Sequence, residues 1–406
     1  MKRRLLLLGA PVFQKPVVHK AQEMGLLVGI ADINADAPAA SCADVFFQGS
    51  IKDFDAMLAI ARRFKPDAIL SGACDTSVVT VARLCEELGL PGSSLESAIN
   101  STDKVAMLEA FARAGVAAPE YRVVRSGDVV ESDLAIPFPV ITKPTDSAGG
   151  RGINVAYSAG ELAAAIEGSS RAGASGDVLV EEFMEGKEVS VEVVVANGVP
   201  HVLQVTDKIT SGAPHYFEIG HSQPAELSES DRIAVSDLAS RAVLSVGLTN
   251  SAAHVEVMLT SDGPKMVELG ARVGGDWITS YLIDNSVSGI NMIETMIRIA
   301  FGETVKDWDY RGSGFSVATK FLPSCEGVLE EISGVDAARR IPGVIHVEAT
   351  GKIGCRYETA VDDSSRFASV VAKGETREKA LAACDSALQM ISARMRDSSC
   401  SERIWQ

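Results

Sequence analysis

The first hundred residues alternate short apolar runs with amphipathic stretches, and this rhythm restricts the fold more than any other feature of the chain. Apolar runs of strand length lie at residues 5–9, 27–31 and 67–70, and amphipathic stretches of helix length lie at 14–24 and 54–64. Strands that alternate with helices form parallel sheets from βαβ units. The chain is therefore predicted to begin with a βα domain.

The turn after the first apolar run lacks the fingerprint of a dinucleotide-binding domain. After Gly9 the sequence continues Ala-Pro-Val-Phe-Gln, so the two further glycines that allow close approach of a pyrophosphate are missing. The basic start and the leucines up to Leu8 are similar to a signal peptide, but Gln14 and Lys15 break the apolar stretch and no convincing cleavage site follows. We therefore expect no NAD binding and no membrane segment, and a cytoplasmic location.

Composition excludes several other classes of protein. The 406 residues are 46% apolar and 23% charged, which suits more than one hydrophobic core and is unlike a disordered or fibrous chain. The formal net charge is −16 and no long Lys/Arg run is present, so nucleic acid is not an expected partner. Seven cysteines without a Cys-x-x-Cys pair indicate reduced thiols, and not a disulfide framework or a zinc site.

Beyond the first βα segment the pattern changes to paired strands, and three units are predicted, at residues 1–115, 116–305 and 306–406. In the middle unit Asn197-Gly198 is a type I′ hairpin signal, and residues 261–263 turn a second hairpin. The last unit reads as a smaller α+β domain. Further helices are expected at 103–114, 228–246 and 377–395, and further strands at 138–143, 178–183, 188–196, 199–206, 254–259, 265–269, 315–321 and 344–349.

A glycine-rich segment follows Lys143 closely. Ser147 precedes three glycines in four positions, Gly149, Gly150 and Gly152, and glycine lets backbone amides approach phosphate oxygens. The lysine adds positive charge. An ordinary glycine-rich turn is an equally good interpretation of this segment taken alone.

Five glutamates fall within twelve residues, at positions 181, 182, 185, 188 and 192. A solvated acidic loop would explain them. However, Glu181 and Glu182 follow an apolar strand that should be buried, where an ionised carboxylate needs a partner. A polar ligand with hydroxyl and amino donors would be such a partner.

Glu256 and Glu268 lie on the two arms of the second predicted hairpin. Adjacent antiparallel strands can place two such side chains together, and the repulsion between them is relieved by a divalent cation. Oxygen ligands favour Mg²⁺ or Mn²⁺. The alternative is two exposed glutamates on a hairpin, because glutamate is mostly a surface residue.

Together these segments resemble the ATP-grasp superfamily, in the family's order over about residues 1–305, and in particular its carboxylate–amine ligases such as L-amino acid ligases. The resemblance implies an ATP-grasp fold of mixed α/β and α+β class: a Rossmann-like pre-ATP-grasp domain, an ATP-grasp domain with a lid at about 119–183, and a small C-terminal α+β domain that completes the cleft. It also implies chemistry through an acyl-phosphate.

The resemblance gives roles to individual residues. Lys104 and Lys143 would contact ATP phosphates, under a flexible loop at 147–152. For the rest of the nucleotide, the resemblance implies Glu181 at the adenine amino group, the backbone of Phe183 or Met184 at the hinge, and Glu188 on the ribose. Glu256 and Glu268 would bind magnesium. Arg272 would bind the transferred phosphoryl group and the carboxylate. Many family members carry Asn two residues after the second metal ligand, where this chain has Gly270. The number of metal ions, one or two, is therefore open.

Contacts to the other substrates are expected from the segment 207–221 and from the turn after Arg272. The family places that segment beside the acceptor, so Lys208, His215, Glu218 and His221 are candidates, although polar surface residues explain them equally well. His221 could accept a proton from an attacking ammonium group.

The turn after Arg272 supplies further candidates. Gly274 and Gly275 would allow close backbone approach, and Trp277 would wall a pocket or, slightly in preference, be core. Asp75 follows a strand of the first domain, where open α/β sheets bind ligands, but a helix N-cap is the preferred role for Asp75 or Thr76.

The sequence thus predicts an ATP- and Mg²⁺-dependent enzyme that joins a small carboxylate, most readily an amino acid, to an amine, with ADP and phosphate as products. One alternative is a purine-type ligase or carboxylase that uses bicarbonate or a sugar amine. Another is a nucleotide-binding subunit without catalysis. ATP-grasp proteins are often dimers, so a homodimer is a further expectation of the resemblance.

Overall fold

A computed structural model describes residues 2–128, 135–147, 149–213, 215–363 and 365–397. The chain divides into two compact units, each assembled from three segments. Unit 1 comprises residues 1–120, 184–205 and 226–311, and unit 2 comprises 121–183, 206–225 and 312–406. Among the described residues, no helix is long and apolar enough to cross a membrane.

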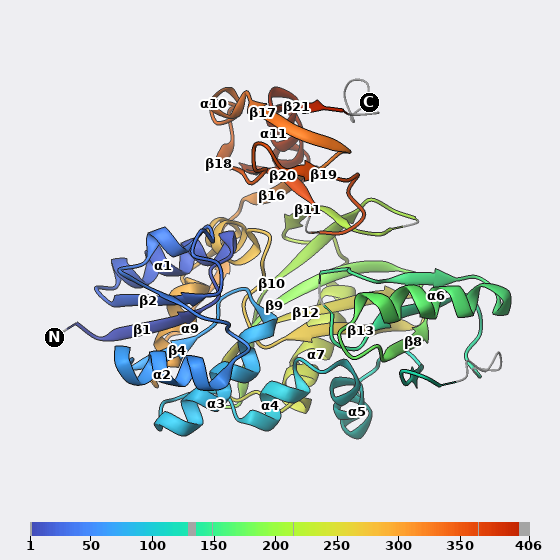
Figure 1. Ribbon diagram of the computed structural model, residues 1–406, viewed down its shortest axis with the longest axis horizontal. Coiled ribbons are helices and arrows are strands. Elements are labelled where there is room, and N and C mark those ends of the chain that lie inside the picture. Colours follow the sequence, from blue (N-terminus) through green and yellow to red (C-terminus); the bar gives the residue numbers. More distant parts are fainter. Residues whose placement is uncertain (1, 129–134, 148, 214, 364, 398–406) are drawn as a thin grey trace. The chain divides into compact units, whose positions relative to one another are not determined.

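The elements of unit 1 run from the N-terminus to Arg311, the first residue of a short strand whose second residue belongs to unit 2 (Figure 1). They are β1 Arg4–Leu8, η1 Val12–Gln14, α1 Lys15–Glu23, β2 Leu27–Asp32, η2 Ala40–Cys42, β3 Val45–Gln48, α2 Phe54–Phe64, β4 Ala68–Leu70, η3 Asp75–Ser77, α3 Val78–Leu88, α4 Leu95–Asn100, α5 Lys104–Ala114, β9 Lys187–Ala196, the first part of β10 Val199–Thr210, α7 Glu229–Ser245, β12 Ser251–Thr260, β13 Gly263–Gly270, η4 Ile278–Leu282, α8 Ile283–Ser286, β14 Val287–Ser288, α9 Met292–Ala300 and β15 Arg311–Gly312.

Unit 2 contains the remaining elements and the end of β10. They are β5 Tyr121–Val124, β6 Val140–Pro144, β7 Asn154–Ala156, α6 Ala159–Ala172, β8 Val178–Glu182, β11 Glu218–Gln223, β16 Ser316–Pro323, β17 Gly327–Ser333, α10 Val335–Ala338, β18 Val344–Ala349, β19 Arg356–Tyr357, β20 Arg366–Gly374, α11 Arg377–Met390 and β21 Ser392–Arg396.

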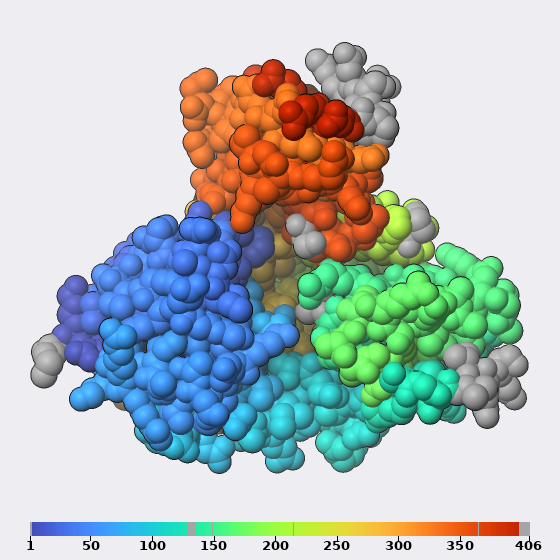
Figure 2. All heavy atoms as spheres, viewed as in Figure 1, coloured from blue at the N-terminus to red at the C-terminus, as the bar shows by residue number. Residues whose placement is uncertain are grey.

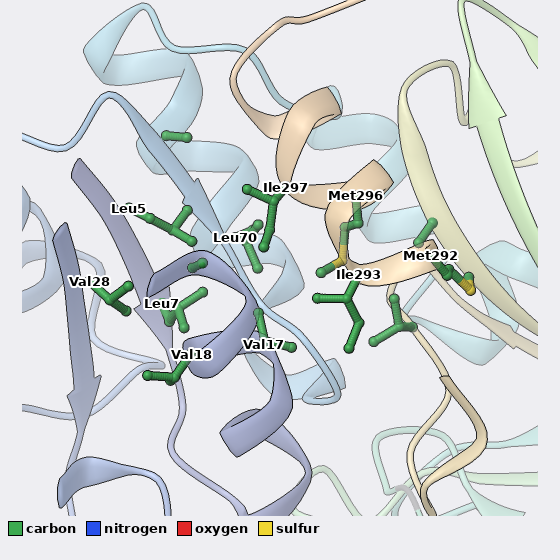
Figure 3. Close-up of a cluster of buried hydrophobic side chains, with 14 of the residues drawn as sticks. Leu5, Leu7, Val17, Val18, Val28, Leu70, Met292, Ile293, Met296 and Ile297 are labelled. Carbon is green, nitrogen blue, oxygen red and sulfur yellow. The ribbon is translucent and has the colours of Figure 1, made fainter. Parts of the chain in front are cut away.

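The predicted βα start is confirmed as a parallel sheet with strand order β3-β2-β1-β4. Successive side chains of a strand point to opposite faces, so β1 supplies both cores. Leu5 and Leu7 pack with α1 and α9, as Figure 3 shows. Leu6 and Leu8 pack with α2 and α3. Both faces of the sheet are covered, and the space-filling view in Figure 2 shows these N-terminal elements as one continuous body.

Antiparallel hairpins form the rest of unit 1. The order β13-β12-β9-β10 is antiparallel between β13, β12 and β9. Asn197 and Gly198 both have positive φ, 53° and 75°, as the predicted type I′ turn requires. Helix α7 packs on β9, β12 and β13.

Unit 2 contains two sheet regions with separate cores. The sheet β5-β8-β6-β7 packs α6 through Leu162, Ala165 and Ile166. Strands β11, β16, β20 and β18 are antiparallel neighbours, and α11 packs on β16 and β20.

The predicted end of the last helix is wrong. We expect a helix over 377–395, but α11 ends at Met390 and residues 392–396 form β21. This strand pairs with β17, from Val328 opposite Arg396 to Ser333 opposite Ser392. The backbone hydrogen bonds of a distant strand outweigh local helix propensity here, because propensity is a weak preference.

Candidate active site

Two carboxylates face each other on the hairpin of β12 and β13. Glu256 is paired in register with Glu268, and a β-bulge follows Glu256. Directly opposed residues have Cβ atoms about 5 Å apart, so two like charges here destabilise each other. The exposed fractions of the two side chains are 25% and 35%, which leaves both accessible. An accessible donor set of oxygens alone fits Mg²⁺ or Mn²⁺.

Helix α5 brings Lys104 to this pair. Asp103 caps the helix by accepting hydrogen bonds from the N–H groups of Val105 and Ala106, which makes Lys104 the first helical residue. The Lys104 Nζ lies 2.8 Å from Oε1 of Glu268, and the lysine side chain is only 8% exposed. The sequence indicates a role for each residue, and the structure joins them in one ion pair. Lys104 therefore offsets one of the two like charges.

His254 contacts the other carboxylate of the pair. Its Nε2 lies 3.5 Å from Oε1 of Glu256, and its Nδ1 is hydrogen-bonded to the buried Glu192, which is opposite His254 in the β9–β12 register. Burial opposes a charged imidazole, but Glu192 and Glu256 prevail and raise the pKa of His254 to about 10. The imidazole is thus cationic at neutral pH.

Glu192 and His254 were not predicted as site residues. A usable signal was present, since both are ionisable residues in apolar strands, and such residues need partners. The strand register that makes the two partners is absent from the sequence.

Arg272 lies just after β13 and pairs with Asp75 of the N-terminal sheet region. Its Nε and Nη2 donate to Oδ1 and Oδ2 of Asp75 at 2.7 and 2.8 Å, and its Nη1 donates to the carbonyl of Val273 at 3.1 Å. The predicted N-cap role of Asp75 or Thr76 is wrong, because α3 starts after Ser77 and no side chain caps it. The Asp75 carboxylate is instead the partner of Arg272.

The two glycines of the turn after Arg272 differ in what they require. The N–H of Gly274 donates to Oε2 of Glu192 at 3.1 Å, and a Cβ added at Gly274 would lie 2.8 Å from the other oxygen of Glu192. At Gly275 an added Cβ would meet Phe13 at 3.7 Å, an ordinary contact. Only Gly274 must therefore lack a side chain.

Trp277 closes this turn as a core residue. It is 2% exposed and makes edge contacts with Phe13 and Tyr281, at centroid distances of 4.9 and 5.6 Å. Asp276 and Trp277 have φ values of 51° and 65°, which are strained for non-glycine residues. Such strain gathers at functional segments.

In unit 2, Lys143 on β6 forms a buried ion pair with Glu181 on β8. The Nζ–Oε2 distance is 2.8 Å, and both side chains are buried. Glu181 is opposite Ile141 in register, so Lys143 is its diagonal neighbour on the same face. The buried glutamate that the sequence required to have a partner has one within the protein.

The glycine-rich segment adopts the backbone that glycine permits. Gly149, Gly150 and Gly152 have φ values of 67°, 72° and 78°, and a Cβ on Gly152 would lie 2.5 Å from that of Ala172. Ser147 precedes them in the same loop, half-buried. The predicted position 148 lies outside the described residues.

The predicted adenine and ribose residues lie where the chain passes from one unit to the other. Phe183 ends a segment of unit 2 and Met184 begins a segment of unit 1. The N–H of Phe183 donates to Pro139 O at 3.4 Å. Glu188 is the second residue of β9 and is half-buried.

Lys208, Glu218 and His221 form one cluster on β10 and β11. Lys208 is opposite His221 in register. The two oxygens of Glu218 lie 2.7 Å from Lys208 Nζ and 3.2 Å from His221 Nε2. Burial opposes ionisation, but Lys208 and His221 hold the pKa of Glu218 well below its usual value of 4.5. His215 lies exposed on the loop between the strands.

Asp363, which precedes β20, and Arg366, its first residue, hold the backbone of Glu218. Asp363 accepts from its N–H at 2.7 Å, and Arg366 Nη2 donates to its carbonyl at 2.9 Å and to Asp363 at 3.0 Å. The Arg366 guanidinium also lies 3.8 Å from the ring centroid of Phe321. The sequence offered no signal for this contact, which joins residues about 145 positions apart.

The chain has an ATP-grasp fold, and the opposed carboxylates of its β12–β13 hairpin suit a divalent cation. Residues 136–281 match the model of an ATP-grasp domain, and residues 320–396 match L-amino acid ligase C-terminal domain 2. The chain therefore contains a segment that matches an ATP-grasp domain, followed by a segment that matches an L-amino acid ligase C-terminal domain.

Individual proteins are also similar to the chain. The chain is similar to protein y4rH of Sinorhizobium fredii, 27% identical over 77% of this chain and 65% of that protein, and to carnosine synthase 1 of Homo sapiens, 25% identical over 74% and 40%. It therefore spans less than two thirds of either relative. The crystal structure of L-amino acid ligase from Bacillus licheniformis is 19% identical, with a TM-score of 0.85 over 98% of this chain and 99% of that one. This likeness shows the fold.

Proposed function

We propose that the chain is an ATP- and Mg²⁺-dependent ligase that activates a small carboxylate, most readily that of an amino acid, and joins it to an amine. The products are an amide or dipeptide, ADP and phosphate. The observation that carries the proposal is the register pairing of Glu256 with Glu268, with Lys104 and His254 in contact with them and Arg272 in electrostatic interaction with Glu256. Mn²⁺ is an acceptable replacement for Mg²⁺ at oxygen ligands.

The chemistry needs positioning and charge neutralisation and no nucleophilic side chain. A carboxylate is a poor electrophile because oxide leaves badly, and transfer of the γ-phosphoryl group of ATP gives an acyl-phosphate that an amine attacks with release of phosphate. Bound at Glu256 and Glu268, the metal ion would neutralise phosphate charge. Lys104 and Lys143 would bind phosphate oxygens, and Arg272 would stabilise the transferred group.

The remaining residues would bind the nucleotide and the amine. The loop at 147–152 would cover the phosphates and exclude water, which hydrolyses acyl-phosphates. Glu181, the backbone of Phe183 or Met184, and Glu188 are proposed for adenine and ribose. His221, oriented by Glu218 beside Lys208, would take the proton that leaves the amine.

We propose that the reaction takes place in the cytoplasm, with small molecules as the partners of the enzyme. The match at 320–396 supports amino acids over the purine-type alternative, because that domain is described from L-amino acid ligases. The cationic residues around both glutamates support an active enzyme over a non-catalytic subunit.

The test is phosphate release from ATP with amino acids supplied singly and in pairs, followed by mass analysis of the products. A new amide with ADP and phosphate is the expected result. AMP and pyrophosphate would rule out the acyl-phosphate route, and turnover with bicarbonate but not amino acids would favour the purine-type alternative.

A further inference from the structure

We propose that Asp75 is a positioning residue that sets the direction of Arg272, and that residue 270 is glycine because the Asp75 carboxylate occupies the space of its side chain. The role given to Arg272 rests on the proposed function above. The geometry involving Gly270 does not depend on it. All three residues belong to unit 1, although Asp75 and Arg272 are 197 positions apart.

The contact between Asp75 and Arg272 fixes the guanidinium plane. Two parallel hydrogen bonds, at 2.7 and 2.8 Å, use both carboxylate oxygens and two of the three guanidinium nitrogens. Such bidentate pairs add geometric specificity as well as energy. The third nitrogen, Nη1, donates to Val273 O at 3.1 Å. The direction in which Arg272 presents its remaining N–H groups is thus determined by Asp75.

One side of Arg272 adjoins open space and is not packed against protein. A cavity of about 80 Å³ adjoins Arg272, and its other walls are largely apolar, including Ile69, Val78, Ala82 and Met296. A space of this size is large enough for water, so no protein side chain packs against the arginine on that side. The ion pair therefore holds the arginine where packing does not. Burial disfavours ionised Asp75, but Arg272 lowers the pKa of its carboxyl below the usual value, so the pair is charged at neutral pH.

Gly270 is the third part of this arrangement. A Cβ added there would lie 2.6 Å from Oδ1 of Asp75, closer than real Cβ atoms approach an oxygen, and 3.4 Å from Arg272 Nε. A side chain at 270 and the observed position of Asp75 are therefore incompatible. The position of the Asp75 carboxylate therefore gives a reason for the glycine at position 270.

The kinetic test compares Asp75→Asn and Asp75→Ala with the wild type, using the amino acid pair that gives most product. We expect kcat to fall about a hundredfold, since misplacement of a reacting group by about 1 Å costs that much. The KM for ATP should stay within about twofold, because Asp75 is not among the proposed ATP contacts. The matched control is Glu87→Gln, which breaks an exposed pair with Arg62 in the same unit and should be neutral. The proposal would be overturned if both Asp75 variants kept the wild-type kcat. It would also be overturned if the KM for ATP rose by the same factor by which kcat fell.

The second test needs no substrate. Thermal unfolding is measured for the wild type, Gly270→Ala, Asp75→Ala and the double variant. Gly270→Ala should lower the midpoint by roughly 2–4 °C in the wild type, because it overpacks the site, and should have no such effect when Asp75 is already alanine. Equal losses in both backgrounds would overturn the packing argument. If no substrate pair is turned over, the proposed function fails, while this cycle still decides whether Asp75 and Gly270 exclude each other.

Discussion

Among single residues, Glu268 carries the clearest functional expectation, because it is opposite Glu256 and paired with Lys104. Glu268→Gln keeps the side chain's size and removes its charge. We expect turnover to fall by about a hundredfold or more, since charge stabilisation in the transition state is typically worth that much.

The control for this variant is Glu109→Gln on α5. The Glu109 carboxylate is exposed and forms a loose ion pair with Arg113, at 3.9 Å. This control should keep wild-type activity, and circular dichroism should show both variants folded. A fully active Glu268→Gln enzyme would contradict the proposed metal ligand.

Glu218 gives a prediction on pH. Its folded pKa lies well below the usual 4.5, because Lys208 and His221 outweigh burial. The stability that it contributes is therefore fully present above pH 4.5 and is lost as the pH falls through the lower folded value. The difference in unfolding free energy between wild type and Glu218→Gln should be constant from pH 7 to about 5, and should shrink below 4.5. Urea unfolding at each pH measures it. A difference that shrank above pH 5 would show that the carboxyl is not held ionised.

At the level of elements, contacts from the start of β20 hold the first residue of β11. Arg366 and Asp363 bind the carbonyl and the N–H of Glu218, so loss of Arg366 should let the Glu218–His221 cluster shift. We expect Arg366→Leu to raise the KM for the amine about tenfold with the KM for ATP little changed, because one charge-assisted hydrogen bond is worth roughly that factor. Steady-state kinetics check this. Arg394→Leu, at an exposed pair with Glu331, is the control; equal effects of both variants would exclude a specific contact.

Gly334, between β17 and α10, allows a matched comparison with Gly314, between β15 and β16. Gly334 and Gly314 share a φ of 82°, but a Cβ on Gly334 would lie 1.7 Å from the carbonyl oxygen of Met390, whereas Gly314 has open space. Gly314→Ala should lower the free energy of unfolding by about 1 kcal/mol, from backbone strain alone. Gly334→Ala should lower it by at least about 3 kcal/mol, because the clash is added to the strain. Urea unfolding compares them. Similar losses would mean that Met390 moves away at little cost.

For the whole molecule, we expect nucleotide and divalent cation together to stabilise the folded state. A bound ligand present at about a hundredfold excess over its Kd stabilises the folded state by roughly 2.7 kcal/mol. ATP with Mg²⁺ should therefore raise the unfolding midpoint, and EDTA should remove this rise and all turnover, because Glu256 and Glu268 are then left without their ion. Mn²⁺ should restore both. Turnover that persisted in EDTA would contradict the metal dependence.

Much of the fold was predictable because it depends on local patterns. The apolar runs around Leu5 and Leu27 and the amphipathic stretch 54–64 became a parallel sheet with helices. The Asn197-Gly198 turn followed from the φ values these residues tolerate. The last helix was predicted too long, because the pairing of β21 with β17 is a long-range property.

The residues of the candidate site divide in the same way. The sequence by itself determined which side chains have suitable chemistry: the glutamates of the second hairpin, the lysines and Arg272. Only the tertiary structure decided their partners, Glu268 for Lys104, Glu181 for Lys143, Glu192 for His254 and Asp75 for Arg272. The physical reason is that residue type and spacing determine local conformation and charge, whereas a buried charge takes whichever partner the packing of distant segments brings within hydrogen-bonding distance.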